Sequence, residues 1–204
     1  GLRAEDLIRV RLEAEPMPAI EFGEVSGIFV GGGPFNASDP ADRKSPVQRR
    51  VEAEFALLLD RVVAADFPFL GACYGIGTLG AHQGAVIDRA HAEPISVADI
   101  TLSTAGAADP LFAGLPSEFG AFVGHKEAVL TLPTHATLLA SSAVCPVQAF
   151  RVGEHVYATQ FHPELDLAGI RTRIHAYAEH GYFAADELDA TLDAVGRAPV
   201  VHTG

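Results

Sequence analysis

The chain has 204 residues, a formal net charge of -12 and a sequence pI near 5.0. Hydrophobic residues make up 49% of it and charged residues 20%, which is the composition of a globular protein rather than of a disordered one. The negative charge would repel a phosphate backbone, so we expect no nucleic-acid partner. The length favours a single domain with its own core.

The longest uncharged stretch, residues 67–87, approaches the length of a membrane span. It contains a proline, a histidine, a glutamine and five glycines, which a lipid-facing helix rarely combines, so we predict a buried strand, turn and helix and no membrane association. The two cysteines, Cys73 and Cys145, give no disulfide framework in a chain without a recognisable signal peptide. This favours a reducing, cytoplasmic location.

Taken in chain order, the first half predicts a strand, a crossover helix and a second strand. Residues 8–13 alternate apolar and charged side chains, which is typical of a half-buried edge strand. Residues 26–30 form a short apolar strand that ends in the glycine-rich loop 31–34. A capping box at 45–48 begins a long amphipathic helix, and residues 68–72 return as a buried strand, which favours parallel pairing.

The second half predicts short strands and then two helices. After Pro163 the pattern indicates helices at 167–180 and 185–195, with a break at Gly181. We therefore expect an α/β fold: a three-layer sandwich with a mixed, mainly parallel central sheet flanked by helices. The short runs that resemble the antiparallel part of such a sheet are residues 95–101, 119–123, 137–140, 147–152 and 156–161.

The segment Gly71-Ala72-Cys73-Tyr74-Gly75 has the form of a nucleophile elbow. Its glycines permit a sharp turn between strand and helix, and a helix N-terminus favours the thiolate. A lone cysteine is more often a small buried hydrophobe. The glycine spacing favours the nucleophile for Cys73, whereas Cys145 lacks such framing and is expected to be structural.

A thiol nucleophile needs a base, and His162 is the candidate. It follows the predicted strand 156–161, and Glu164 projects to the same side two residues later, where it can orient one ring nitrogen while the other faces the thiol. Zinc is a weaker alternative, because zinc deaminases with a His-x-Glu element also need Pro-Cys-x-x-Cys, which this chain lacks. We expect no metal and no cofactor.

The loop at 31–34 is not followed by the Gly-Lys-Ser/Thr of a nucleotide-binding loop. The simplest interpretation is a bare turn. The mechanistic interpretation is that one of its amides, together with the Tyr74 amide, binds the oxyanion of a tetrahedral intermediate.

In chain order, the chain carries the glycine-rich loop at 31–34, the elbow at 71–75 and the segment Gln160-Phe161-His162-Pro163-Glu164. Together they resemble the class I, triad-type glutamine amidotransferases over roughly residues 25–164. The stretches 109–116 and 124–127 resemble the amidotransferase domain of GMP synthase. The resemblance implies that Cys73 is the nucleophile, that His162 is the general base and then acid, and that Glu164 orients it.

The same resemblance implies oxyanion donors at Gly33 and Tyr74, and substrate contacts at Gly124 and Lys126. It also implies an enzyme that hydrolyses glutamine to glutamate and ammonia through a cysteine thioester and passes the ammonia to a synthetase partner. Gly77 departs from the family, which usually has glutamine there. This leaves open a γ-glutamyl amide other than glutamine as the substrate, or a partner-dependent regulatory subunit with little activity alone.

The family fold normally begins with a further strand and helix, of which only a helix tail is expected here, at residues 2–8. We therefore expect one amidotransferase-like domain over residues 1–204 that lacks its N-terminal strand unless an upstream segment supplies it. The sequence leaves homo-oligomerisation open.

Overall fold

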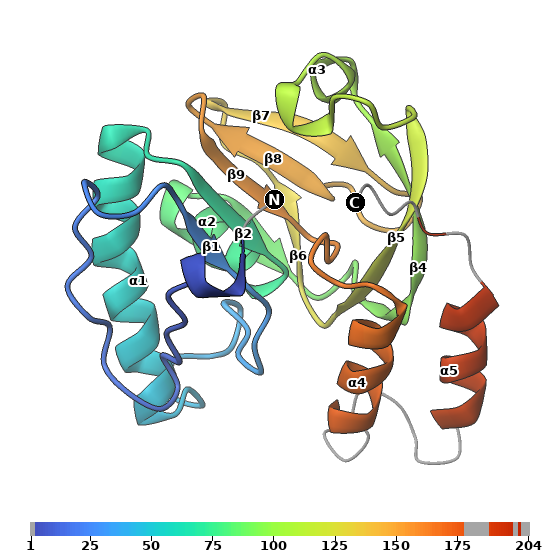
Figure 1. Ribbon diagram of the computed structural model, residues 1–204, viewed down its shortest axis with the longest axis horizontal. Helices are drawn as coiled ribbons and strands as arrows, with labels where there is room; N and C mark the ends of the chain where they lie inside the picture. The colour runs from blue at the N-terminus through green and yellow to red at the C-terminus, as the bar shows by residue number, and fades with distance from the viewer. Residues whose placement is uncertain (1–2, 178–187, 198–199, 201–204) are drawn as a thin grey trace.

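The computed structural model describes residues 3–177, 188–197 and 200. Its centre is a seven-stranded sheet in the order β1-β2-β9-β8-β7-β4-β5 (Figure 1). The strands of this sheet are β1 (Ile28–Val30), β2 (Phe69–Ala72), β4 (Glu93–Leu102), β5 (Glu118–His125), β7 (Ala136–Ser141), β8 (Ala149–Val152) and β9 (Val156–Thr159). A separate two-stranded sheet pairs β3 (Val86–Asp88) with β6 (Ala128–Thr131).

The α/β class and the mixed sheet flanked by helices are confirmed, but the expectation of mainly parallel strands is wrong. Two of the six neighbouring pairs are parallel, β1 with β2 and β2 with β9, and the other four are antiparallel. Parallel neighbours need a long crossover, whereas β8 and β9 are joined by a tight turn at Gly153, whose φ is 62°.

The crossover between β1 and β2 is the helix α1 (Pro46–Ala65). Ser45 caps it as expected, since its hydroxyl accepts a hydrogen bond from the Gln48 amide at 3.1 Å, and proline occupies the first turn. Its apolar face, which includes Phe55 and Leu59, packs with α2 (Tyr74–Gln83) in the largest core cluster, against β1, β2, β8 and β9.

The other face of β8 carries a second cluster, in which Ala149 packs with Phe119 and Ile100. On β5, Phe122 belongs to a third cluster, together with residues of α4 (Leu167–Tyr177) and α5 (Leu188–Arg197), the paired helices of Figure 1. Both predicted C-terminal helices are thus present. Residues 178–180 and 185–187 of those predictions, and the break at Gly181, lie outside the described residues.

The predicted strand at residues 8–13 is wrong. No strand forms there, and Ile8 is 78% exposed. The carbonyls of this region accept hydrogen bonds from a side chain and not from a neighbouring strand. Arg50 of α1 donates to the carbonyls of Leu12 at 2.7 Å and Glu15 at 3.0 Å. Of the helix tail expected at residues 2–8, the structure describes residues 3–8. Within them, Ala4–Asp6 form a short 3-10 helix, η1.

The uncharged stretch at 67–87 forms β2, α2 and the start of β3. Across the described part of the chain, no helix combines the length and the apolar character that crossing a membrane requires. Two short helical turns, α3 (Thr104–Ala107) and η2 (Pro110–Phe112), lie between β4 and β5.

Candidate active site

Cys73 forms a sharp turn between β2 and α2. Its backbone angles are φ 55° and ψ -94°, a conformation that residues with a Cβ rarely adopt. The turn brings two glycines into contact, because a Cβ on Gly71 would lie 2.8 Å from the carbonyl carbon of Gly75. A Cβ on Gly75 would in turn lie 3.1 Å from the Val30 carbonyl oxygen of β1. The elbow thus depends on glycine at both positions.

His162 and Glu164 follow β9, next to β2 in the sheet. The strand ends at Thr159, so the histidine lies three residues beyond the strand, and its amide donates to the Phe122 carbonyl of β5 at 2.9 Å. His162 Nδ1 lies 2.7 Å from Glu164 Oε1, and the histidine side chain is 1% exposed. The predicted pairing of these two side chains is present.

The electrostatics of His162 favour its protonated form. Burial alone would lower the pKa of His162, but interactions with Cys73 and then with Glu164 outweigh burial and raise this pKa to about 9. Burial likewise opposes ionisation of Glu164, but its hydrogen bond with His162 holds the pKa of Glu164 below its ordinary value. The pair is therefore best described as imidazolium and carboxylate.

The second ring nitrogen, Nε2, is buried and has no hydrogen-bond partner among the described residues. The effect of Cys73 on the pKa of His162 shows that the thiol lies near the ring, although no aligned hydrogen bond joins them. The thiol itself lies 3.9 Å from the Gly124 carbonyl oxygen. Nε2 is thus the nitrogen available for proton exchange beside Cys73.

Arg173 of α4 is a further member of the site that the sequence did not indicate. Its guanidinium lies 3.3 Å from His162 Nδ1, and its charge acts to lower the pKa of His162. Because Nδ1 carries the proton for Glu164, we interpret Arg173 as a neighbouring cation rather than a donor to that nitrogen. A Cβ on Gly32 would lie 2.7 Å from Arg173 Nη2 and 3.0 Å from His162 Cε1.

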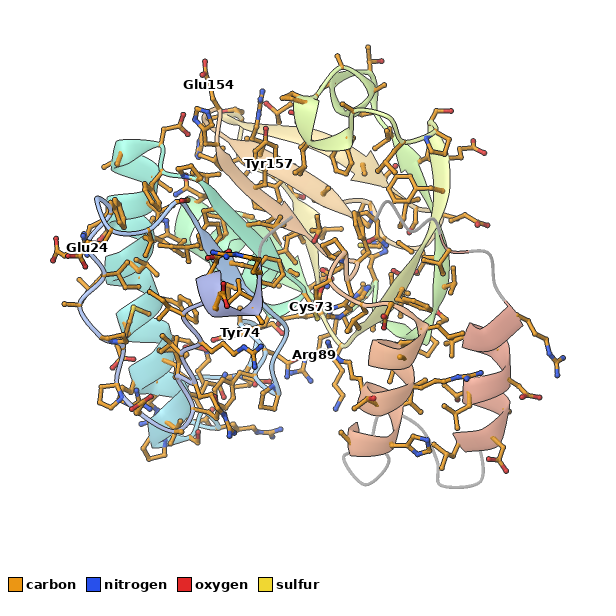
Figure 2. The ribbon with its side chains drawn as sticks, in the orientation of Figure 1. Glu24, Cys73, Tyr74, Arg89, Glu154 and Tyr157 are labelled. Carbon is orange, nitrogen blue, oxygen red and sulfur yellow. The ribbon has the colours of Figure 1, made fainter. Side chains whose placement is uncertain are left out.

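The glycine-rich loop therefore lies against the histidine. Its next residue, Gly33, lies beside Tyr74, since a Cβ there would be 3.9 Å from Tyr74 Cδ1. Figure 2 places Cys73 and Tyr74 near the middle of the molecule, and the Tyr74 ring packs edge-on against Phe35 and Phe55. The loop, the elbow and the histidine thus meet at one place, as the sequence predicted.

The two expected substrate-contact residues lie at the end of β5. Gly124 is buried and its carbonyl faces the Cys73 thiol. Lys126 is half-buried in the bend between β5 and β6. The structure therefore brings Gly124 to the nucleophile, and substrate contact by Lys126 stays a prediction.

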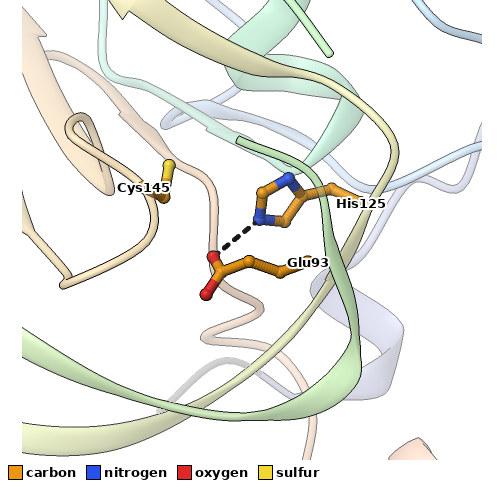
Figure 3. Close-up of side chains that lie close together, drawn as sticks. All are labelled: Glu93, His125 and Cys145. Carbon is orange, nitrogen blue, oxygen red and sulfur yellow. Dashed lines mark hydrogen bonds and ion pairs between the residues drawn. The ribbon is translucent and has the colours of Figure 1, made fainter. Parts of the chain in front are cut away.

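A second grouping of the same three residue types lies where β4 begins and β5 ends (Figure 3). Glu93, His125 and Cys145 are all buried, and one ligand atom from each lies within 4.8 Å of the others. His125 Nε2 contacts Glu93 Oε2 at 2.9 Å, and His125 Nδ1 lies 2.8 Å from the Glu127 carbonyl oxygen. By residue type the grouping matches a triad and would also suit zinc.

Its thiol is more deeply buried than that of Cys73. Cys145 is 0% exposed, and burial raises its pKa to about 12, so it stays protonated at neutral pH. The Cys145 thiol donates to the Val147 carbonyl at 3.4 Å, and Gln148 donates to Glu93 at 2.9 Å. The polar atoms that would hold a metal are thus already bonded within the protein. A third set with ligand-like spacing, Asp66, Glu154 and His155, lies at the surface.

Known proteins of similar sequence or fold point to one family. The sequence pattern of the family "Glutamine amidotransferase class-I" matches residues 6–185. A GMP synthase (glutamine-hydrolyzing) subunit of Thermoplasma acidophilum is 29% identical over 147 residues, and the corresponding subunit of Methanocaldococcus jannaschii is 30% identical over 152. These alignments cover 72% and 74% of this chain, and 66% and 71% of the two relatives.

A crystal structure of a glutamine amidotransferase from Thermotoga maritima superposes with a TM-score of 0.72 at 22% identity. The superposition covers 89% of this chain and 74% of that one, and it shows that the fold is shared. The chain therefore belongs to the class I glutamine amidotransferase family.

Proposed function

We propose that this chain hydrolyses glutamine to glutamate and ammonia, with Cys73 as nucleophile, His162 as general acid and base, and Glu164 as the residue that orients His162. The observation that carries the proposal is the 2.7 Å pair between His162 and Glu164, which leaves a buried Nε2 beside a thiol on a glycine-framed elbow. This is the arrangement that a thiol nucleophile requires.

In the proposed reaction the Cys73 thiolate attacks the side-chain amide carbon of glutamine. The carbonyl oxygen becomes an oxyanion, for which the backbone amides of Gly33 and Tyr74 are the proposed donors. The carbon–nitrogen bond then breaks, and ammonia leaves with the proton of His162. Water attacks the resulting thioester, returns a proton to His162, and releases glutamate and the thiolate.

Cys73 is the proposed nucleophile in preference to Cys145. The Cys145 thiol is sealed in the core and its raised pKa opposes the thiolate that attack requires. Cys73 is partly exposed, lies at a helix N-terminus and adjoins His162.

The ammonia acceptor is proposed by analogy with the relatives. Two of them are named as one subunit of a glutamine-hydrolyzing GMP synthase, so we propose that a separate synthetase subunit receives the ammonia. Gly124 and Lys126 are proposed to contact the substrate. We further propose that residues 1–204 act as one domain and that the protein works in the cytoplasm.

The test is glutamate release from glutamine by the wild-type chain, by Cys73→Ala and by Cys145→Ala. We expect loss of turnover in Cys73→Ala only, and covalent labelling of Cys73 by a glutamine-like electrophile, detected by mass spectrometry. Turnover that survives in Cys73→Ala would overturn the assignment. Hydrolysis of γ-glutamyl amines but not of glutamine would replace the substrate and keep the mechanism. Activity that depends on an added synthetase subunit would indicate a partner-dependent protein.

A further inference from the structure

The segment that follows the glycine-rich loop is held by a buried carboxylate from a distant part of the chain. We infer that Glu127 is a positioning residue for this loop, and that its carboxylate occupies the space a side chain at position 77 would otherwise fill. The inference deepens the proposed function, on which its kinetic part rests.

Glu127 lies between β5 and β6 and is 6% exposed. One of its carboxylate oxygens accepts the Ala37 amide at 2.8 Å, and the other accepts the Ser38 amide at 2.7 Å. Charge-assisted bonds to two successive amides fix both the position and the orientation of that stretch of backbone. The stretch begins four residues after Gly33, the proposed oxyanion donor.

Other bonds to this segment come from α1, from Lys44 just before that helix, and from Arg89, which donates to the Ser38 hydroxyl at 3.4 Å and pairs with Asp39. Gln48 donates to the Asn36 carbonyl at 3.0 Å, and Lys44 donates to the Ala37 carbonyl at 3.1 Å and pairs with Glu52 at 2.8 Å. Glu127 instead ties the segment to the end of β5, the strand whose Gly124 carbonyl faces the thiol. Glu127 therefore links the segment that follows Gly33 to the strand whose Gly124 carbonyl faces the Cys73 thiol.

Gly77 belongs to the same arrangement. It lies in the first turn of α2, and its amide donates to the Cys73 carbonyl at 3.5 Å. A Cβ on Gly77 would lie 2.7 Å from Glu127 Oε1 and 3.6 Å from the Ala37 Cβ. Even an alanine at position 77 would therefore push the carboxylate away from the two amides it binds.

The test is a double-mutant cycle on Glu127 and Gly77. Glu127→Gln keeps the shape but replaces one acceptor oxygen by an NH₂ group, which faces an amide N–H and cannot accept from it. We expect Glu127→Gln and Gly77→Ala each to lower kcat for glutamine by about 10- to 100-fold with a smaller change in KM, since a misplaced loop weakens the transition state most. Adding Gly77→Ala to Glu127→Ala should cost nothing further, because the obstructing carboxylate is gone.

Matched controls are Glu118→Gln, on the exposed start of β5, and Gly23→Ala, where a Cβ would meet nothing within 4 Å. Two measurements do not depend on glutamine turnover. Amide hydrogen exchange of residues 34–44 should become faster in Glu127→Gln and in Gly77→Ala. Alkylation of Cys73 by iodoacetamide should stay near the wild-type rate in the same variants. If Glu127→Ala fails to fold, the two other single variants still decide the question.

Wild-type kcat in Glu127→Gln, or independent effects of the two sites in the cycle, would overturn the inference. If the wild-type chain hydrolyses no glutamine, the proposed function fails, and hydrogen exchange alone then decides whether Glu127 holds the segment. Unchanged exchange in that case would overturn the inference as well.

Discussion

The backbone at Cys73 predicts an unusual order of stability between two substitutions. A non-glycine residue with a positive φ of this kind costs about 1–3 kcal/mol. At an ordinary position, glycine is less stable than alanine by about 0.5–1 kcal/mol. Both Cys73→Gly and Cys73→Ala remove the thiol, so their difference isolates the backbone. We expect Cys73→Gly to be the more stable of the two, by about 1 kcal/mol after the two effects are subtracted.

The assay is urea and thermal unfolding of both variants, where about 1 kcal/mol corresponds to about 2–4 °C in Tm for a chain of this length. The second cysteine supplies the matched control, because in the described residues only Asp66 and Cys73 combine a side chain with a positive φ. Cys145→Gly should therefore be less stable than Cys145→Ala. The same sign at both cysteines would refute the reasoning, since it would mean that the elbow stores no strain.

Three further outcomes follow from the described contacts. Glu164→Gln should lower the pKa of His162, which is about 9 in the wild type. The fall in kcat/KM for glutamate release at alkaline pH should therefore begin at a lower pH. An alkaline fall at the wild-type pH would contradict the pairing. Gly71→Ala should destabilise the protein by about 1–3 kcal/mol, read as a lower urea midpoint, because its Cβ meets the Gly75 backbone. Burial opposes ionisation of Asp66, but hydrogen bonds from the β8–β9 turn outweigh it and lower the pKa of this carboxyl. Asp66→Asn should therefore lower the free energy of unfolding by less than about 1 kcal/mol at neutral pH, and this loss should disappear as acid protonates the wild-type carboxylate. A loss of stability that does not change with pH would contradict the prediction.

The parts of the site that the sequence predicted are those encoded over a few residues. The glycines at 71 and 75 frame the cysteine locally, and the histidine and its carboxylate partner are two residues apart, so their geometry needs little from the rest of the chain. The capped crossover helix was predictable for the same reason, because Ser45 and Pro46 act on the turn they belong to.

The parts that the sequence did not indicate depend on distant contacts. Arg173 reaches the histidine from α4 and is marked by no local pattern. Glu127 lies in the stretch 124–127 that resembles GMP synthase, but nothing in that stretch indicates that it binds amides some ninety residues earlier in the chain. The strands β3 and β6, which pair with each other, are three and four residues long. Such short strands show no recognisable alternation of apolar and polar side chains in the sequence. Residues 8–13 alternate like a strand, yet Arg50 binds the carbonyl of Leu12.

The pairing of β2 with β9 also decides when catalysis can begin. Cys73 and His162 follow the carboxyl ends of these parallel strands, whose residues Ala72 and Thr159 lie side by side, and the Cys73 amide donates to the Thr159 carbonyl at 2.8 Å. Bringing β9 beside β2 closes the long stretch of chain between Ala72 and Thr159, which costs about 4 kcal/mol of chain entropy. A chain still emerging from the ribosome can form the elbow early, but it has no base until the strand after Gly153 has been made and has threaded in beside β2. Proton exchange between Cys73 and His162 would thus begin only after β9 has paired with β2.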